Sequence, residues 1–361
     1  MLIYACTSAH GFGHGSRCAA VLGALARLRP HWRLVISTAL PAPFLDLAFA
    51  DVPHERRHCR WDVGVVQADA LAVDGEATLA ALDELQGQID TTIEREADWL
   101  RRQQGPVLVL ADVPPDAVRL AGCIDAPLVW LASFGWDAIY RPMGEAFAPW
   151  AERCLRLYRQ GDLLLGCPFS LPMPWGLPRV ELGITSAPPR HPAGTVRQRL
   201  DLPPDRDRCV LISFGGLGLA LDPDLLARWP DHCFLGSEPS LAEVANGRWL
   251  PPDLRPVDVM PVMGRLITKP GYSSFCEAFA HDVGIHLVRR TGFAEAPVLE
   301  QALRRHGRHR LLEQVEFHAG EWQLDRPLLE PVEGPLRLDG ALRAAAAIAT
   351  AAEQGISKSD R

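Results

Sequence analysis

The sequence predicts an α/β protein of two doubly wound, Rossmann-like domains whose parallel sheets face each other across a cleft. Three observations predict it: short apolar runs alternate with amphipathic segments, a proline-rich stretch interrupts the alternation, and the alternation then begins again. Strands that are apolar throughout and alternate with helices are typical of parallel sheets covered on both faces. The length of 361 residues also exceeds what one hydrophobic core usually organises.

Strand-length apolar runs and helical patterns alternate through the first predicted domain, residues 1–168. The predicted strands are LIYACTS (2–8), RLVISTA (33–39), VLVLAD (107–112) and LVWLAS (128–133). The predicted helices are SRCAAVLGALARL (16–28), the long segment 76–103 and DAVRLAGC (116–123). Ser16 is a suitable N-cap for the first helix, because its hydroxyl can accept a hydrogen bond from an unpaired helix N–H.

Prolines separate this domain from the second one. The stretch 169–194 is dense in proline, which disfavours helix and sheet interiors, so we expect the interdomain linker there. The second domain, residues 195–335, has predicted strands at 209–216, 233–237, 265–268 and 285–290 and predicted helices near 222–229, 273–281 and 296–306. The last segment, 336–361, contains an alanine-rich helix at 339–354. In each domain, ligands should bind beyond the carboxyl ends of the strands.

The composition excludes several classes of function. A net charge of −7 gives no basic face for a nucleic-acid partner. No run approaches the roughly 18 apolar residues of a membrane span, and the N-terminus lacks the regions of a signal peptide. The 9 cysteines are scattered without a C-x-x-C pair, which is typical of reduced thiols in a cytoplasmic protein. No sequence pattern specifies an oligomeric state.

A glycine-rich loop, SAHGFGHGSR (8–17), follows the first predicted strand. Its glycines permit tight turns and close approach to a ligand. His10 and His14 lie in this loop, on the side of the expected cleft. Asp112 ends another predicted strand, where its carboxylate could orient a histidine and stabilise the protonated form. Two alternatives stay open: the histidines are solvated in a structural turn, or Asp112 caps the following helix.

Aromatic residues follow the strand LVWLAS. Asp137 lies just beyond it, with Trp136 and Tyr140 as neighbours in the chain. These three residues could line a pocket for an acceptor substrate, or the rings could simply pack in the core.

The second domain contains features suited to a diphosphate. Gly215 and Gly216 follow a predicted strand and can present backbone N–H groups to an anion. A helix begins at the triplet Tyr272-Ser273-Ser274, where unpaired N–H groups and the helix dipole attract negative charge. The chain has two lysines, and Lys269 is the one that precedes this helix start. A compact ammonium there suits a phosphate oxygen.

Glu277 lies along the same predicted helix, on the face of Ser273 and Ser274. Its carboxylate can accept two hydrogen bonds from a ribose diol. The spacing Ser274-x-x-Glu277 fits a capping box equally well, and that alternative stays open.

Metal-binding patterns are weak. DRD (205–207) and DPD (222–224) flank a strand in proline-containing turns, where solvated turn carboxylates explain them. No set of His, Cys and Asp residues has metal-ligand spacing, so the sequence predicts no metal site.

Six motifs together resemble nucleotide-sugar glycosyltransferases of the two-Rossmann-domain (GT-B) type. They are HGFGHGSR, ADVPPD, SFGWDAIY, SFGG, TKPGYSSFCEAFA and VRRTGFAEAPVLEQAL. Within that class, the chain is most similar to the glycosyltransferase-like N-terminal domain of L-arabinokinases, from about residue 3 to residue 322. The kinase module of those proteins would follow this region, so we expect no sugar kinase activity here.

The resemblance implies inverting, metal-independent transfer of a sugar from a nucleotide-diphosphate donor, with a UDP-sugar expected, to an acceptor hydroxyl. The donor would be a substrate, and no cofactor is expected. His14 would be the general base, with Asp112 as its partner. The positions that match donor-binding residues are Gly215, Gly216, Ser273 and Ser274 at the diphosphate, with Lys269 and Tyr272 beside them, Glu277 at the ribose, and Glu295 and Gly13 at the sugar.

The chain also departs from the plant UDP-glycosyltransferase signature, because it lacks the Trp and the Asp-Gln pair of that signature. The base, the sugar and the acceptor therefore cannot be transferred from the resemblance. Two other functions stay open: a nucleotide-sugar epimerase or hydrolase, for which Asp137 or Glu145 could supply acid chemistry, and a non-catalytic nucleotide-sugar-binding protein.

Overall fold

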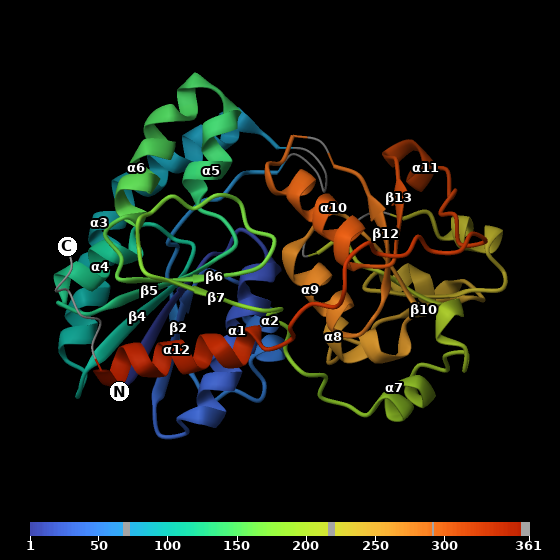
Figure 1. Cartoon of the computed structure of the whole chain (residues 1–361), viewed down its shortest axis with the longest axis horizontal. Helices are drawn as coiled ribbons and strands as arrows, with labels where there is room; N and C mark the ends of the chain where they lie inside the picture. Colours follow the sequence, from blue (N-terminus) through green and yellow to red (C-terminus); the bar gives the residue numbers. More distant parts are fainter. Residues whose placement is uncertain (68–72, 216–220, 291, 355–361) are drawn as a thin grey trace. The chain divides into compact units, whose positions relative to one another are not determined.

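The computed structural model of the chain describes residues 1–67, 73–215, 221–290 and 292–354. They form two compact α/β units, drawn in Figure 1. Unit 1 contains residues 1–67, 73–185 and the segment from Asp339 onward, and unit 2 contains residues 186–338. Each unit has one parallel sheet, so the prediction of two Rossmann-like domains is confirmed.

Unit 1 is built on a 7-stranded sheet with the order β3-β2-β1-β4-β5-β6-β7. Its strands are β1 (Leu2–Thr7), β2 (Arg33–Thr38), β3 (Glu55–His58), β4 (Val107–Asp112), β5 (Leu128–Ala132), β6 (Leu163–Gly166) and β7 (Arg179–Glu181). Its helices are α1 (Phe12–Leu28), α2 (Ala42–Ala48), α3 (Gly75–Arg101), α4 (Ala117–Cys123), α5 (Trp136–Tyr140), α6 (Ala148–Tyr158) and α12 (Gly340–Gln354). The four predicted strands of this domain correspond to β1, β2, β4 and β5.

The central strands β1 and β4 end level with each other. They pair in parallel, with Thr7 opposite Asp112 at their carboxyl ends. All of β1 is buried, which explains why its sequence is an uninterrupted apolar run instead of an alternating one. This register brings the loop after β1 and the residues after β4 to the same edge of the sheet.

Helix α1 begins at Phe12, with Gly11 as its N-cap, so the prediction of Ser16 as the N-cap is wrong. Gly13 and Gly15, two of the glycines that suggested a loop, lie at the start of the helix instead. Close packing requires Gly15, because a Cβ atom there would lie 2.4 Å from the Phe44 ring of α2. His14 is therefore a helical residue.

The proline-rich stretch 169–194 belongs largely to unit 1, which ends at Thr185. Within it, β7 pairs with β6 at the edge of the sheet. An edge strand needs hydrogen bonds on one side only, so prolines next to it are tolerated. The division between the units falls inside the predicted linker.

The C-terminal helix α12 packs against α1, as Figure 1 shows for the red and blue helices. Its buried face includes Ala344, Ala345 and Ile348. A Cβ atom at Gly340 would lie 2.1 Å from the carbonyl oxygen of Gly183, so the helix start contacts the backbone directly. The predicted alanine-rich helix is confirmed and forms part of unit 1.

Unit 2 has a 6-stranded parallel sheet with the order β10-β9-β8-β11-β12-β13. Its strands are β8 (Cys209–Ile212), β9 (Cys233–Gly236), β10 (Gly247–Trp249), β11 (Arg265–Thr268), β12 (Gly284–Val288) and β13 (His309–Leu312). Its α-helices are α7 (Ala193–Arg199), α8 (Pro256–Val259), α9 (Tyr272–Ala280), α10 (Glu295–His306) and α11 (Gln314–His318). The helix predicted near 222–229 is a 3-10 helix, Pro223–Arg228.

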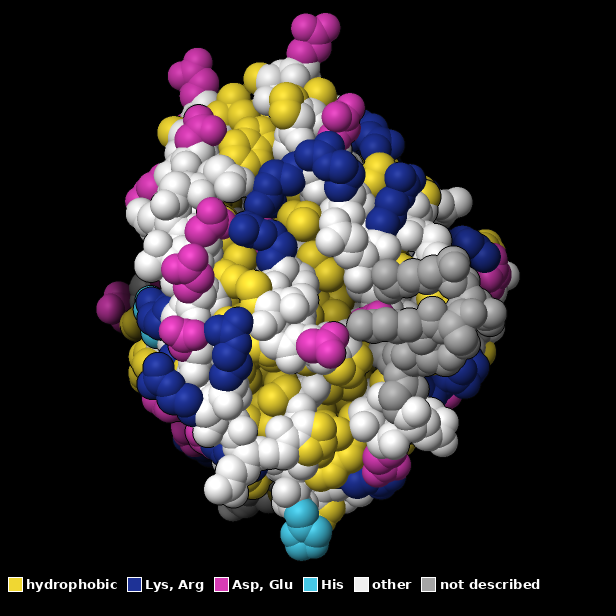
Figure 2. All heavy atoms as spheres, turned by 90° about the vertical axis from the view of Figure 1, so that its left-hand side faces the viewer, with side chains coloured by type: hydrophobic (Ala, Val, Ile, Leu, Met, Phe, Trp, Pro, Cys, Tyr) yellow, Lys and Arg dark blue, Asp and Glu magenta, His cyan; other side chains and the backbone are white. Residues whose placement is uncertain are grey.

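Charges of both signs are interspersed on the face of the molecule that Figure 2 shows. Unit 1 contains ion pairs such as Arg119–Asp90, between α4 and α3, and Arg101–Asp98, within α3. The nine cysteines form no disulfide among the described residues. Over the same part of the chain, no helix combines the length and the apolar character that a bilayer crossing demands.

Candidate active site

Two neighbouring strand ends of unit 1 carry the candidate catalytic residues. Asp112 is the last residue of β4, and His14 is the third residue of α1, which begins shortly after β1 ends. Because β1 and β4 are adjacent and in register, the first turn of α1 and the end of β4 meet at the carboxyl edge of the sheet. The tertiary structure thus brings together two residues that the sequence had suggested as partners.

His14 and Asp112 are hydrogen-bonded. The distance from His14 Nδ1 to Asp112 Oδ1 is 2.8 Å. A carboxylate can only accept, so Nδ1 carries a proton, and in a neutral imidazole Nε2 is then left with a lone pair. His14 is 8% exposed and Asp112 is fully buried, so this bond lies in a largely water-free environment. An imidazole in this state can accept a proton from a substrate through Nε2.

A third member of this cluster, Arg17, was not predicted from the sequence. Its Nε atom donates to Asp112 Oδ2 at 2.8 Å, and its Nη2 atom donates to Asp112 Oδ1 at 2.5 Å. A further bond joins Nη1 to the Ser133 hydroxyl at 3.0 Å. Burial alone would raise the pKa of Asp112, but Arg17, together with His14, holds that pKa below its usual range. Asp112 is therefore a carboxylate. The interval of three residues between His14 and Arg17 on one helix was the available signal.

The residue after Asp112 adopts an unusual backbone conformation. Val113 has a φ of 80°, which is strained for a β-branched side chain and costs of the order of 1–3 kcal/mol. Tyr158 donates a hydrogen bond to the Val113 carbonyl at 2.7 Å and so supports this turn. Helix α4 begins only at Ala117, after Asp116. The alternative that Asp112 caps this helix is wrong.

A second buried carboxylate lies close to this cluster and was not predicted. Asp62 accepts hydrogen bonds from the Ser8 hydroxyl at 3.0 Å and from Trp136 Nε1 at 2.8 Å. Burial raises the pKa of Asp62; Trp136, His14 and Ser8 oppose this effect, and Asp112 adds to it. The segment around Asp62 has no strand or helix pattern, so only the folded structure places this carboxylate beside Ser8 at the end of β1.

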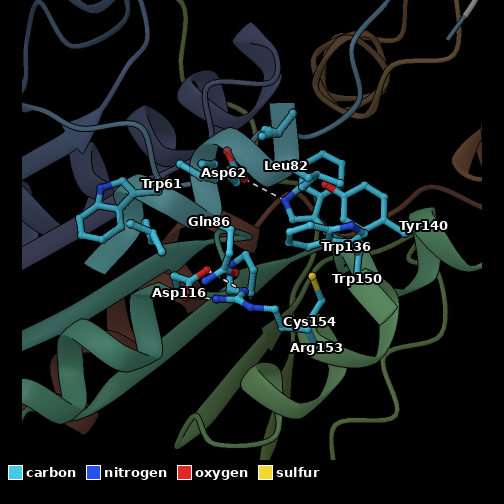
Figure 3. Close-up of a pocket in the computed structure, with 14 residues that line it drawn as sticks. Trp61, Asp62, Leu82, Gln86, Asp116, Trp136, Tyr140, Trp150, Arg153 and Cys154 are labelled. Carbon is cyan, nitrogen blue, oxygen red and sulfur yellow. Dashed lines mark hydrogen bonds and ion pairs between the residues drawn. The ribbon is translucent and has the colours of Figure 1, made fainter. Parts of the chain in front are cut away.

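A small pocket in unit 1 opens beside Asp62 (Figure 3). Its accessible volume is about 20 Å³, room for roughly one water molecule. The lining residues are Trp61, Asp62, Val63, Leu82, Leu85, Gln86, Ile89, Pro115, Asp116, Trp136, Tyr140, Trp150, Arg153 and Cys154. The close-up shows the Asp62–Trp136 bond on one side and the Asp116–Arg153 ion pair on another.

Two of the three residues predicted for an acceptor pocket line this space. Trp136 and Tyr140 stack with ring centroids 5.8 Å apart, and the Tyr140 hydroxyl donates to the carbonyl of Gly64. Asp137 is buried but does not belong to the lining. Both rings are almost fully buried, so their role toward an acceptor stays a prediction.

In unit 2, the candidate donor residues follow the carboxyl ends of β8 and β11. The Thr268 hydroxyl donates to the Ser213 carbonyl at 2.6 Å and ties the two strand ends together. Gly215 has a φ of 79°, a conformation that favours glycine, and among the described residues other than its chain neighbours no atom lies within 4 Å of where its Cβ would be. Gly216 lies outside the described residues.

Helix α9 begins at Tyr272, with Gly271 as its N-cap and no side-chain cap. Ser273 and Ser274 are consequently the second and third residues of the helix, and the capping-box alternative for Ser274 and Glu277 is wrong. The helix start follows Lys269 and Pro270 directly, as predicted. A helix N-terminus, with the helix dipole behind it, is a place where an anion is favoured.

Glu277 is half-buried on α9. Burial raises its pKa to about 7; Arg255 acts in the lowering direction and Asp258 in the raising direction. No hydrogen bond to its carboxyl group is present among the described residues, and its role toward a ribose stays a prediction.

The remaining predicted positions lie at helix starts. Glu295 is the first residue of α10 and is 7% exposed, and Gly13 is the second residue of α1. A pocket of about 280 Å³ adjoins the start of α10 and the segment after Lys269. Its lining residues are Pro270, Arg290, Ala296, Pro297, Glu300, Gln301 and Arg304.

The acidic patterns DRD and DPD are turn caps, as expected. Asp205 accepts from the N–H of Asp207, and Asp222 from the N–H of Asp224. In the described part of the chain, no three His, Cys, Asp or Glu side chains are grouped so that they could hold a metal ion.

The two parallel sheets, with their strand ends carrying these residues, define a GT-B fold. Solved structures share it over nearly their whole length. UGT89C1 of Arabidopsis thaliana, solved with UDP, has a TM-score of 0.60 at 11% identity, covering 99% of this chain and 96% of that one. A UDP-glucosyltransferase from Polygonum tinctorium, capable of glucosylating indoxyl, has a TM-score of 0.59 at 15% identity, with 99% and 95% covered. The glycosyltransferase of kitacinnamycin has a TM-score of 0.57 at 14% identity, with 96% and 95% covered.

At the level of sequence, the chain is similar to the L-arabinokinase of Arabidopsis thaliana. The two are 29% identical over 308 residues, which is 81% of this chain. The chain spans only 29% of the length of that arabinokinase. No protein-family model matches the chain.

Proposed function

We propose that the protein transfers a sugar from a UDP-sugar to an acceptor hydroxyl with inversion at the anomeric carbon. The observation that carries the proposal is the hydrogen bond from His14 Nδ1 to Asp112 Oδ1, which leaves Nε2 as a base. The GT-B fold supports it, because the similar structures include UGT89C1 solved with UDP and with UDP-L-rhamnose.

In the proposed reaction, Nε2 of His14 removes the proton of the acceptor hydroxyl while the oxygen attacks the anomeric carbon. The bond between that carbon and the β-phosphate oxygen breaks, and UDP leaves with the electron pair. Asp112 holds the imidazole in the correct tautomer and stabilises the imidazolium that forms. A positioned base of this kind contributes about 10²–10⁴-fold to the rate.

We assign donor binding to unit 2. The start of α9, the backbone at Gly215 and the ammonium of Lys269 would stabilise the leaving diphosphate without a metal ion. Glu277 would accept hydrogen bonds from the ribose, and Glu295 would contact hydroxyls of the donor sugar.

The test begins with thermal unfolding against a panel of nucleoside diphosphates and UDP-sugars. A ligand at about 100 times its Kd should stabilise the protein by about 2.7 kcal/mol. Transfer is then measured with the donor so found and a panel of hydroxyl acceptors. His14→Ala should abolish transfer and leave the thermal shift nearly intact, whereas His31→Ala, which changes an exposed histidine of the same unit, should alter neither.

Each other outcome contradicts a defined part of the proposal. Unchanged turnover in His14→Ala would exclude this base. Release of UDP and free sugar without an acceptor product would indicate a hydrolase. No thermal shift with any nucleotide would exclude both the transferase and the hydrolase.

A further inference from the structure

We propose that Arg17 is a positioning residue: it holds Asp112 as a carboxylate in one fixed orientation and thereby sets the tautomer of His14. The catalytic part of this inference rests on the proposed function. The structural part, the tautomer of His14, can be measured in the absence of any substrate.

The contact between the Arg17 guanidinium and the Asp112 carboxylate is bidentate. Nε meets Oδ2 and Nη2 meets Oδ1, so the planar guanidinium faces the planar carboxylate edge to edge. This geometry fixes the rotation of the carboxylate about its own axis. Because Oδ1 is also the atom bonded to His14 Nδ1, fixing the carboxylate fixes the acceptor of the imidazole proton.

Arg17 is itself held in place. Its side chain is 2% exposed, and Nη1 donates to the hydroxyl of Ser133, which follows β5. The guanidinium therefore joins α1 to the ends of two neighbouring strands, β4 and β5. A rotation of the Asp112 carboxylate away from His14 would break its hydrogen bonds to Arg17, because the buried guanidinium cannot move with it.

Burial makes this arginine necessary. Asp112 is fully buried, and an uncompensated carboxylate in such a place tends to bind a proton. A protonated Asp112 could donate to Nδ1 instead of accepting from it, which would place the imidazole proton on Nε2. That tautomer cannot take a proton from a substrate through Nε2. Arg17 prevents this change by keeping Asp112 ionised.

Arg17 also lies 3.4 Å from His14 Nδ1 through its Nη2 atom. Both groups carry protons there, so this approach is no hydrogen bond and gives Arg17 no direct role in proton transfer. Its effect on catalysis must pass through Asp112. We therefore expect changes at Arg17 to lower kcat and to leave KM for the donor unchanged.

The experiment is a two-bond ¹H–¹⁵N spectrum of ¹⁵N-histidine-labelled protein at about pH 8.5, above the usual histidine range. The His14 signals are assigned by their loss in His14→Gln. In the wild-type protein, the tautomer protonated on Nδ1 should outnumber the other by roughly tenfold or more, as a charge-assisted hydrogen bond requires. Ser133→Ala, which leaves both bonds to Asp112 in place, should give the same spectrum.

Two variants decide the matter. Arg17→Gln removes the charge, and the Nδ1-protonated tautomer should lose its dominance in the folded protein. Arg17→Lys keeps the charge but bonds one oxygen at a time, and it should give a mixture. Should Arg17→Gln fail to fold, Arg17→Lys carries the test alone. A folded Arg17→Gln or Arg17→Lys protein with the wild-type tautomer ratio would overturn the proposal, and this result would not depend on whether the protein is a transferase.

Discussion

The Nδ1 atom of His14 lies 2.8 Å from Oδ1 of Asp112, although the two residues are 98 positions apart in the chain. The contact exists because β1 and β4 are neighbours that end in register, so that the first turn of α1 comes down beside the last residue of β4. With Nδ1 bonded to Asp112, Nε2 is the ring nitrogen left for a substrate in the proposed reaction.

Asp112→Asn should lower transfer activity by about 10²–10⁴-fold and leave UDP binding in place. The reason is that an amide can donate to Nδ1, which moves the imidazole proton to Nε2. The matched control is Asp116→Asn, which also changes a buried carboxylate paired with arginines. Steady-state kinetics and thermal unfolding of both variants provide the comparison. Equal losses of activity in the two variants would show that stability, not the tautomer, explains the effect.

Lys269→Ala should weaken UDP binding by about tenfold or more and change the free energy of unfolding little. Lys269 is partly buried, and we expect its ammonium, next to the start of α9, to contribute more to anion binding than to packing. Isothermal titration with UDP and denaturant unfolding measure the two quantities. Arg208→Ala removes one exposed cation from the same unit and serves as the control. Affinity that falls equally in both variants would indicate general electrostatic attraction in place of a site.

Glu277→Gln should stabilise the protein at pH 8 and weaken UDP binding at the same pH. Burial raises the pKa of Glu277 from 4.5 to about 7. Between these two pH values, Glu277 is therefore protonated in the folded protein and ionised in the unfolded protein. The carboxylate therefore destabilises the folded protein above pH 7, by about 1–2 kcal/mol after allowance for partial exposure. Removing the charge recovers this free energy at pH 8 but not at pH 4.5.

The same shift predicts a pH dependence for ligand binding. Only the ionised Glu277 can accept two hydrogen bonds from a ribose, so UDP affinity of the wild-type protein should rise as the pH passes through about 7. The affinity of Glu277→Gln should stay level over that range. A parallel rise in both proteins would assign the titration to another group.

Asp258→Asn should destabilise unit 2 by about 3–5 kcal/mol at neutral pH. The carboxylate is fully buried and bonds the side chains of Arg190 and Arg255, so its loss leaves two guanidinium groups without their shared anion. Asp253→Asn, which changes an exposed partner of Arg199, should have no measurable effect. Denaturant unfolding of both variants distinguishes a buried ion-pair network from a surface one.

The effect of Asp258 should also depend on pH in a defined direction. Burial would raise its pKa, but Arg255 and Arg190 outweigh burial and lower that pKa. A lowered pKa in the folded state gives stability that is present above the unfolded value, near 4, and is lost as the pH falls further. The difference between wild type and Asp258→Asn should therefore shrink below about pH 4. A difference that stays constant with pH would mean that packing, not charge, is responsible.

Much of the architecture could be predicted because buried parallel strands leave uninterrupted apolar runs. VLVLAD, LVWLAS and RLIT became strands at nearly the predicted bounds. Edge elements such as β3 and β7 were missed, since one exposed side gives them mixed composition. Helix α1 begins earlier than expected, and Gly15, one of the glycines that suggested a loop, lies inside it and packs against Phe44.

The sequence by itself singled out His14, Asp112, Lys269 and Glu277 as candidate site residues. Asp112 ends a strand and Lys269 follows one, whereas His14 and Glu277 lie in the helices that begin after strands. Only the tertiary structure decided which of them meet. Strand order and register, which long-range pairing sets, decide three contacts. They are the hydrogen bond between His14 and Asp112, the hydrogen bonds from Arg17 to Asp112, and the hydrogen bond from Ser8 to Asp62. Local sequence patterns indicate whether a segment is a helix or a strand. Which other elements lie beside it depends on the packing of the whole sheet.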